Sequence, residues 1–145
     1  MLKRRGSAVW NGTGAEGQGR LSTFSGALQD QPYSTAMRFQ SEDGRAGTNP
    51  EELIAAAHAA CFNMALSFQL TGAGFPPEEL ITTAVLTMEQ EGVHWSITAV
   101  RLELTGNVPG ISEEKFQDLV EAAKSGCPVS KALNVDISVA ATLAR

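Results

Sequence analysis

The chain has 145 residues, enough for one domain with its own core, and we expect a single domain over residues 1–145. Eleven Lys and Arg against 16 Asp and Glu give a net charge of −5, which argues against nucleic acid or an anionic membrane as partner. The basic residues 1–5 are followed by polar residues and glycine rather than by the apolar run of a signal peptide. We therefore expect a cytoplasmic protein, whose two cysteines are reduced at rest.

The first 40 residues show no helical period, and short apolar runs between frequent glycines predict strands joined by turns. Residues 33–39 alternate, which predicts a strand. On that strand Arg38 would share its face with small side chains and have room to lie flat. A polar loop is expected at 41–47.

The sequence predicts a long helix over residues 49–71. Asn49 is the expected cap, Pro50 occupies the first helical position, and Glu51 and Glu52 place two acids in the first turn. The helix would end near Gly72, and a pair of prolines follows it.

The uncharged stretch 53–70 within this helix is as long as a bilayer-spanning segment. Six of its 18 residues are Ala, and polar side chains such as His58 and Asn63 interrupt it, so its transfer energy is weak. It indicates a buried helix of a soluble protein. A helix that is apolar on nearly all sides needs cover on nearly all sides, which predicts a partner subunit.

The second half of the chain predicts a hairpin, two helices and a final strand. Residues 80–90 and 93–105 are rich in β-branched side chains and predict an antiparallel hairpin. Ser112 is the expected cap of a helix reaching about Ser125, with Ile111 able to pack on Phe116. A short helix at 127–133 and a strand at 135–143 follow. The expected fold class is α+β, with antiparallel β-sheets around a long buried central helix.

Cys61 lies in the apolar middle of the long helix, where burial raises the pKa of a thiol and slows its reactions at neutral pH. A nearby cation would be needed to stabilise the reactive thiolate. The candidates are His58, three residues earlier on the same helix face, and Arg38. Arg38 is the better ion-pair partner, because a guanidinium stays charged when partly buried and can hold a carboxylate and a thiolate together.

Glu51 is the expected carboxylate. Glu52 stands at the third helical position, where an acid reaches back to the N–H of Asn49, so Glu52 has a structural task. Ten helical residues separate Glu51 from Cys61 by about 15 Å, too far for one Arg side chain to bridge easily. A site made of Glu51, Arg38 and Cys61 therefore requires two chains, and we expect an obligate homodimer with composite sites.

Cys127 precedes Pro128 at the start of the short helix, where the positive helix end favours a thiolate. This place suits a resolving or leaving thiol, although both cysteines could also be inert packing residues. The other possible metal ligands are His58 and His94. Neither Cys-x-x-Cys nor His-x-x-x-His spacing occurs and no glycine-rich loop precedes a helix, so neither a metal site nor a phosphate-bearing cofactor is expected.

The segment at 48–62 reads TNPEELIAAAHAACF and closely resembles the OsmC/Ohr family of thiol-dependent peroxidases. The resemblance extends to AVWNG at 8–12 and to GCPVS at 126–130, so it covers almost the whole chain. The early Trp-x-Gly segment, the expected strand with Arg38, and His58 are more similar to the OsmC (osmotically inducible protein C-like) branch than to the Ohr branch.

This resemblance implies an intertwined α+β homodimer with two interfacial sites. The implied enzyme reduces organic hydroperoxides, and hydrogen peroxide less well. Cys61 matches the peroxidatic cysteine and Cys127 the resolving one. The activating Glu falls on Glu51 and the Arg on Arg38, with Arg45 in the neighbouring loop as the alternative. Cys61 would be oxidised to sulfenic acid, resolved by Cys127 as an intrachain disulfide and reduced by a dithiol of the lipoyl type.

Two other functions stay open from the residues. The chain could be a non-catalytic module that binds a hydrophobic ligand or a partner, or a general disulfide reductase that acts without peroxide. For the peroxidase, the apolar surroundings of Cys61 favour alkyl or lipid peroxides over hydrogen peroxide.

Overall fold

The computed structural model describes residues 1–144 and divides the chain into two compact units, one covering residues 1–53 and the other starting at Ile54. The fold is α+β, with two small sheets and one long helix. Each unit is described by itself.

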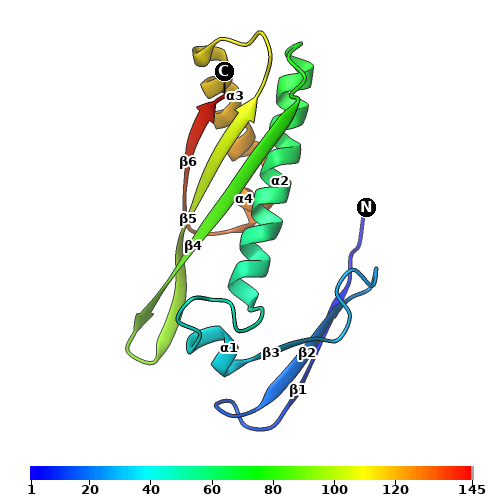
Figure 1. Cartoon of the computed structure of the whole chain (residues 1–145), viewed down its shortest axis with the longest axis vertical. Helices are drawn as coiled ribbons and strands as arrows, with labels where there is room; N and C mark the ends of the chain where they lie inside the picture. Colours follow the sequence, from blue (N-terminus) through cyan, green and yellow to red (C-terminus); the bar gives the residue numbers. More distant parts are fainter. Residues whose placement is uncertain (145) are drawn as a thin grey trace. The chain divides into compact units, whose positions relative to one another are not determined.

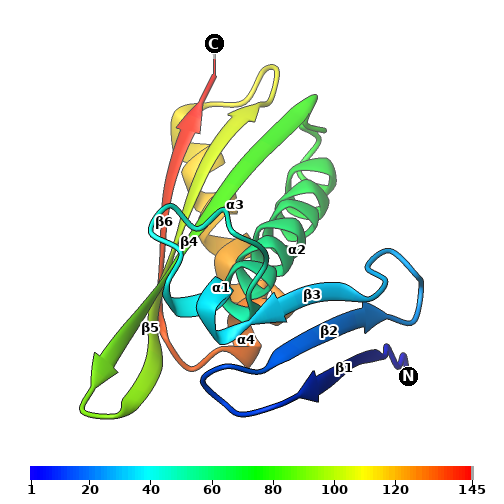
Figure 2. The same cartoon turned by 60° about the horizontal axis from the view of Figure 1, so that its bottom comes forward.

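The first unit is a three-stranded antiparallel sheet followed by a short helix (Figure 2). Its strands β1, β2 and β3 pair in sequence order, which confirms the prediction of strands joined by turns in this part of the chain. The strands are β1 (Gly6–Asn11), β2 (Gln18–Thr23) and β3 (Gln31–Ser34), and the helix is α1 (Thr35–Phe39).

The predicted strand at 33–39 is wrong, because the chain leaves β3 at Ser34 and turns into α1. The Ser34 side chain accepts a hydrogen bond from the backbone N–H of Met37 (3.1 Å), which caps the new helix. Arg38 therefore lies in the last turn of α1 and not on a strand face. An alternating pattern of seven residues did not reveal the capping serine within it.

The first sheet contains very little buried material. All six residues of β1 are exposed, and within the first unit only Gly17 and Gly19 are fully buried. Gly19 lies beneath the rings of Trp10 and Tyr33, whose centroids are 5.5 Å apart. A Cβ at Gly19 would come within 2.5 Å of the Tyr33 ring. The aromatic pair thus requires glycine at this position, but it does not amount to a hydrophobic core.

The second unit combines a second sheet with three helices, and Figure 1 shows the long helix α2 running along this sheet. The sheet order is β4-β5-β6, and the two-residue loop between β4 and β5 contains Gly92 at φ 64°. The predicted hairpin, helices and final strand are all present. Their bounds are α2 (Pro50–Gly72), β4 (Glu79–Glu91), β5 (His94–Asn107), α3 (Glu113–Gly126), α4 (Pro128–Ala132) and β6 (Asp136–Leu143).

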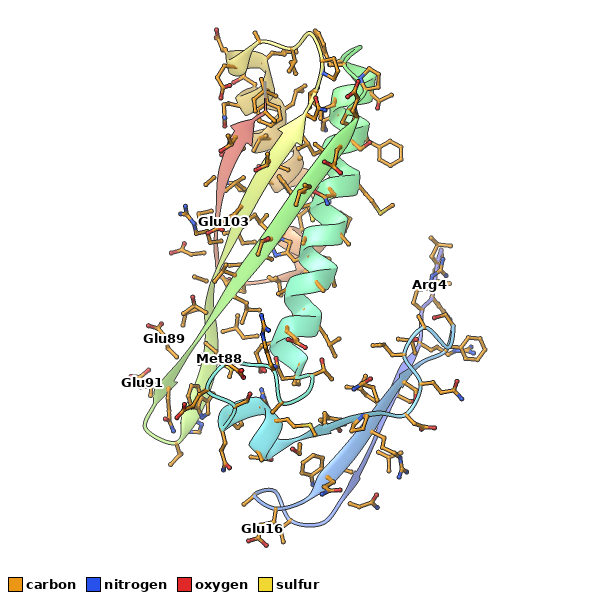
Figure 3. The ribbon with its side chains drawn as sticks, viewed as in Figure 1. Arg4, Glu16, Met88, Glu89, Glu91 and Glu103 are labelled. Carbon is orange, nitrogen blue, oxygen red and sulfur yellow. The ribbon has the colours of Figure 1, made fainter. Side chains whose placement is uncertain are left out.

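The expectation of purely antiparallel sheets is wrong for the last strand, because β6 pairs with β5 in parallel. The helices α3 and α4 connect the two strands and return the chain to the same end of the sheet, as a parallel pair requires. The β4–β5 pairing shifts register between Thr87 and Met88. Met88, Glu89 and Glu91 lie toward the far end of this hairpin (Figure 3).

One core holds the second unit together. α2 contributes a stripe at every fourth residue, consisting of His58, Phe62, Leu66 and Leu70, all fully buried. The stripe packs with buried residues of β5 and α3, among them Val100, Leu102, Leu104, Phe116 and Val120.

On the opposite side of α2, Met64 and Phe68 are 64% and 76% exposed, so the described residues of the second unit do not cover this face. The prediction of a helix buried all round is therefore met on one face only. By length and composition α2 could also cross a membrane. The face of α2 that carries Phe62 and Leu66 instead packs against the sheet, as one face of a core helix does.

Candidate active site

An ion pair between Arg38 and Glu51 is the main electrostatic feature of the first unit. The guanidinium binds the carboxylate in a two-pronged arrangement: Nε lies 3.0 and 3.1 Å from the two oxygens, and Nη2 also donates to Oε1. The Arg38 side chain is 37% exposed and that of Glu51 is 13% exposed. Within residues 1–144, Nη1 of Arg38 has no hydrogen-bond acceptor, and the guanidinium carbon lies 4.8 Å from the centre of the Phe39 ring.

The local sequence explains which acid takes this place. Asn49 Oδ1 accepts a hydrogen bond from the backbone N–H of Glu52 (2.8 Å), which caps α2. Glu52 is exposed, whereas Glu51 turns to Arg38. The alternative cation, Arg45, lies exposed in the loop, and its backbone N–H donates to the Asp43 carboxylate (3.0 Å). Arg38 is therefore the arginine that the structure pairs with Glu51.

The two cysteines meet in the second unit. Cys61 lies on α2 and is partly buried, and Cys127 is fully buried between α3 and α4. Both are free thiols; Cys61 packs against the core that contains Cys127, and each thiol shifts the pKa of the other. The position of Cys127 follows from the helix end before it: its backbone N–H closes α3 on Ala123 O (2.9 Å), and Pro128 then starts α4.

The pKa values of the two thiols shift in opposite directions. Burial raises the pKa of Cys61, and its contact with Cys127 adds to this effect, while the backbone of Val129 opposes it. Burial also acts to raise the pKa of Cys127, but the backbone and hydroxyl of Ser130, the Cys61 side chain and the backbone of Val129 together lower it. Both directions agree with the sequence-based expectations. Cys61 thus needs a cation, and among the described residues of the second unit no cationic side chain contributes to its pKa.

His58 does not provide that cation, so the prediction of His58 as a candidate is wrong. Burial lowers the pKa of His58, and the ring is fully enclosed and therefore neutral at pH 7. Its Nε2 lies 2.8 Å from Ser130 Oγ, across the interface between α2 and α4. In the sequence, Ser130 was noticed only as part of the segment 126–130 that resembles the OsmC/Ohr family. No spacing rule links it to His58, 72 residues away.

A mostly apolar hollow of ≈ 370 Å³ opens beside Cys61. α2, the end of α3 and the start of α4 form its walls, and the partly exposed residue Cys61 lies among them, beside a space that accepts an apolar molecule. The lining residues are Cys61, Met64, Ala65, Phe68, Gln69, Ala122, Ala123, Gly126 and Pro128.

The structure thus brings the four predicted site residues together as two pairs. Arg38 and Glu51 form a pair in the first unit, and Cys61 and Cys127 form a pair in the second. Over residues 1–144 no group of three or more His, Cys, Asp or Glu side chains is arranged to hold a metal ion. The chemistry available is that of two adjacent thiols and a carboxylate-bound guanidinium.

Comparison with known proteins identifies the family. Residues 41–141 match the family model described as OsmC-like protein. The chain is 44% identical over 138 residues to peroxiredoxin OsmC of Escherichia coli (strain K12), covering 95% of this chain and 94% of that protein. It is 33% identical over 123 residues to organic hydroperoxide resistance protein OhrB of Bacillus subtilis (strain 168), covering 83% and 87%.

The fold agrees with the sequence match. The crystal structure of OhrB of Bacillus subtilis superposes with a TM-score of 0.73 at 27% identity, covering 95% of this chain and 98% of that one. The higher identity to OsmC than to OhrB also confirms the branch predicted from the early Trp-x-Gly segment and His58. The chain belongs to the OsmC-like protein family.

Proposed function

We propose that the protein is a thiol-dependent peroxidase that reduces organic hydroperoxides, and hydrogen peroxide less well. The observation that carries the proposal is the packing of Cys61 against the core that contains Cys127, beside an apolar hollow. A peroxidatic thiol must be reachable, and Cys61 is the more exposed of the two. The names of the relatives, peroxiredoxin and organic hydroperoxide resistance protein, support the same chemistry.

The reaction begins at Cys61. Its thiolate attacks the distal oxygen of the hydroperoxide; an S–O bond forms, the O–O bond breaks, and the alkoxide leaves as an alcohol after taking up a proton. Cys61 is then a sulfenic acid. The Cys127 sulfur attacks the Cys61 sulfur, and an intrachain disulfide forms with release of water. An external dithiol, for which we propose the lipoyl type, then exchanges with this disulfide. Cys61 and Cys127 are reduced to thiols, and the dithiol is oxidised to its own disulfide.

Activation of Cys61 requires the Arg38 and Glu51 pair. Because α2 is continuous from Pro50 to Gly72, Glu51 and Cys61 of one chain are about 15 Å apart along the helix. We propose a homodimer in which Arg38 and Glu51 of one protomer serve Cys61 of the other. The uncovered side of α2 with Met64 and Phe68, and the sheet of the first unit that lacks a core, support such a dimer.

The substrate and setting follow from the same features. The lining around Cys61 favours peroxides with an alkyl or lipid tail. We propose that the whole chain works as one domain in the cytoplasm, where dithiol reductants are available, without a metal or organic cofactor.

The proposal is tested by peroxide consumption with dithiothreitol as reductant. Wild type should consume cumene hydroperoxide faster than hydrogen peroxide, and Cys61→Ser should lose the activity. A matched variant, Cys127→Ser, should keep one turnover but accumulate oxidised Cys61. Turnover by Cys61→Ser at the wild-type rate would overturn the peroxidase, and reduction of protein disulfides without peroxide would favour a disulfide reductase instead.

A further inference from the structure

A buried histidine in an apolar core needs an explanation. His58 is fully enclosed among residues such as Phe62, and its Nε2 lies 2.8 Å from Ser130 Oγ. Enclosing a polar ring is unfavourable unless its hydrogen bonds are made. The mechanism above gives His58 no task, and this bond is what ties the middle of α2 to α4.

Ser130 connects this histidine to the second thiol. It lies three residues after Cys127, in the first turn of α4, so the two side chains share one face of this helix start, and Ser130 contributes to lowering the pKa of the Cys127 thiol. A serine hydroxyl has one proton. If that proton is given to sulfur, the oxygen must accept from His58, which places the histidine proton on Nε2.

The other ring nitrogen agrees with this assignment. His58 Nδ1 is buried and has no hydrogen-bond partner among residues 1–144. With the proton on Nε2, Nδ1 is an unpaired acceptor, which is tolerated better than an unpaired N–H. On this assignment the three groups would form a chain with one direction: His58 N–H to Ser130 oxygen, and Ser130 O–H to Cys127 sulfur.

We propose that Ser130, oriented by His58, is the positioning residue of the resolving step: its hydroxyl holds the Cys127 thiolate in place for attack on oxidised Cys61. This inference rests on the proposed function. As the S–S bond forms, the S–O bond of the Cys61 sulfenic acid breaks, and hydroxide leaves and combines with the proton lost by Cys127 to give water. When a dithiol later attacks Cys61, Cys127 departs as a thiolate that the same hydroxyl stabilises.

The surroundings of Cys127 leave this role to local groups. The titratable side chain that acts on it is Cys61 of α2, and His58 of the same helix is linked to it only through Ser130, while β5 contributes apolar residues to the same core. The charged residues of the adjacent elements point to solvent or pair among themselves: Lys124 of α3 binds Glu121 (3.2 Å), and Lys131 of α4 and Asp136 of β6 are exposed.

The kinetic test separates the two steps of the reaction. Reduced protein receives one equivalent of cumene hydroperoxide, and samples quenched over time are analysed by intact mass for sulfenic acid and for disulfide. Ser130→Ala should slow disulfide formation about tenfold, the loss expected for one hydrogen bond to a charged group. Ser130→Thr keeps the hydroxyl and should restore the rate.

Two histidine variants test the direction of the chain. His58→Gln can still donate from its amide and should remain close to wild type, whereas His58→Leu should slow resolution like Ser130→Ala. The double variant His58→Leu with Ser130→Ala should be no slower than Ser130→Ala alone, because the histidine acts through the serine. If His58→Leu fails to fold by circular dichroism, the pair of Ser130 variants decides.

A second readout does not depend on turnover. In a Cys61→Ser background, the ultraviolet absorbance of the Cys127 thiolate is followed against pH, and Ser130→Ala should move the midpoint up by about one unit. Equal midpoints and equal disulfide rates in Ser130→Ala and wild type would overturn the inference. A wild type that consumes peroxide but forms no disulfide would instead overturn the resolving role of Cys127, and the midpoint would still decide about Ser130.

Discussion

The two sheets of this molecule are built in opposite ways. The β4-β5-β6 sheet buries Val100, Leu102 and Leu104 of its middle strand under α2 and α3. The β1-β2-β3 sheet exposes all of β1 and buries only glycines. The thiol pair is fixed on the packed unit, and the charged pair on the unit without a core. The difference indicates that the second unit carries most of the stability. In the proposed function, the first unit supplies the charged pair that activates Cys61, and a partner subunit covers this unit.

The largest expected effect tests where the stability lies. Phe62→Ala, at a fully buried position of α2, should lower the free energy of unfolding by about 3–5 kcal/mol. Phe24→Ala in the first unit, where the ring is 80% exposed, is the matched control and should change it by less than about 0.5 kcal/mol. Denaturant titration at a fixed protein concentration measures both, because a dimer makes stability depend on concentration. A similar loss in both variants would contradict the comparison.

The Arg38–Glu51 pair should matter much more for activity than for stability. Glu51→Gln should lower the rate of peroxide consumption about a hundredfold, as removal of one electrostatic element from an active site does. It should cost at most about 1 kcal/mol of stability, because the Arg38 side of the pair is 37% exposed and solvent screens it. Steady-state kinetics and denaturant titration of the same sample check both numbers. Glu52→Gln is the control and should leave the rate unchanged.

The aromatic pair of the first sheet offers a finer test of how little holds that unit. Gly19→Ala would push a Cβ to 2.5 Å from the Tyr33 ring and 2.8 Å from Trp10, an overpacking that costs about 1–3 kcal/mol. Gly14→Ala places its Cβ in open space and should be neutral. Tryptophan fluorescence during unfolding, measured with Trp95 replaced by Phe so that Trp10 is the only tryptophan, follows both variants. If Gly19→Ala is as stable as Gly14→Ala, the ring contact contributes nothing.

A contrast between local and long-range interactions explains how much of the fold could be predicted from the sequence. The long helix, the hairpin and the cap at Ser112 were predictable because period, β-branching and capping residues are local signals, and Ser112 does accept from Lys115 N–H (3.2 Å). The parallel pairing of β6 and the helical turn at Arg38 were not, because one depends on a crossover and the other on a single serine cap.

The candidate site followed the same division. Cys61, Cys127 and Glu51 were predictable from their places on helices. The bond from His58 to Ser130 was not, because it joins residues 72 positions apart whose separate patterns suggest only packing and a short helix. The prediction that His58 could be the cation near Cys61 is wrong for a related reason: the sequence does not show that the ring is completely enclosed.

The smallest expected effect concerns the protonation of His58, the buried histidine of the second unit, and the pH dependence of stability. Burial lowers the pKa of His58 in the folded protein, whereas the unfolded chain has the ordinary value of about 6.5. Below that pH the unfolded state binds a proton that the folded state does not, so stability is lost as the pH falls through about 6.5. The free energy of unfolding should drop by about 1 kcal/mol from this group between about pH 7 and pH 5.5. His58→Gln cannot take up that proton, and its stability should fall less over the same range. Equal slopes in the two proteins would mean that His58 is protonated in the fold, which would also remove the neutral donor that orients Ser130.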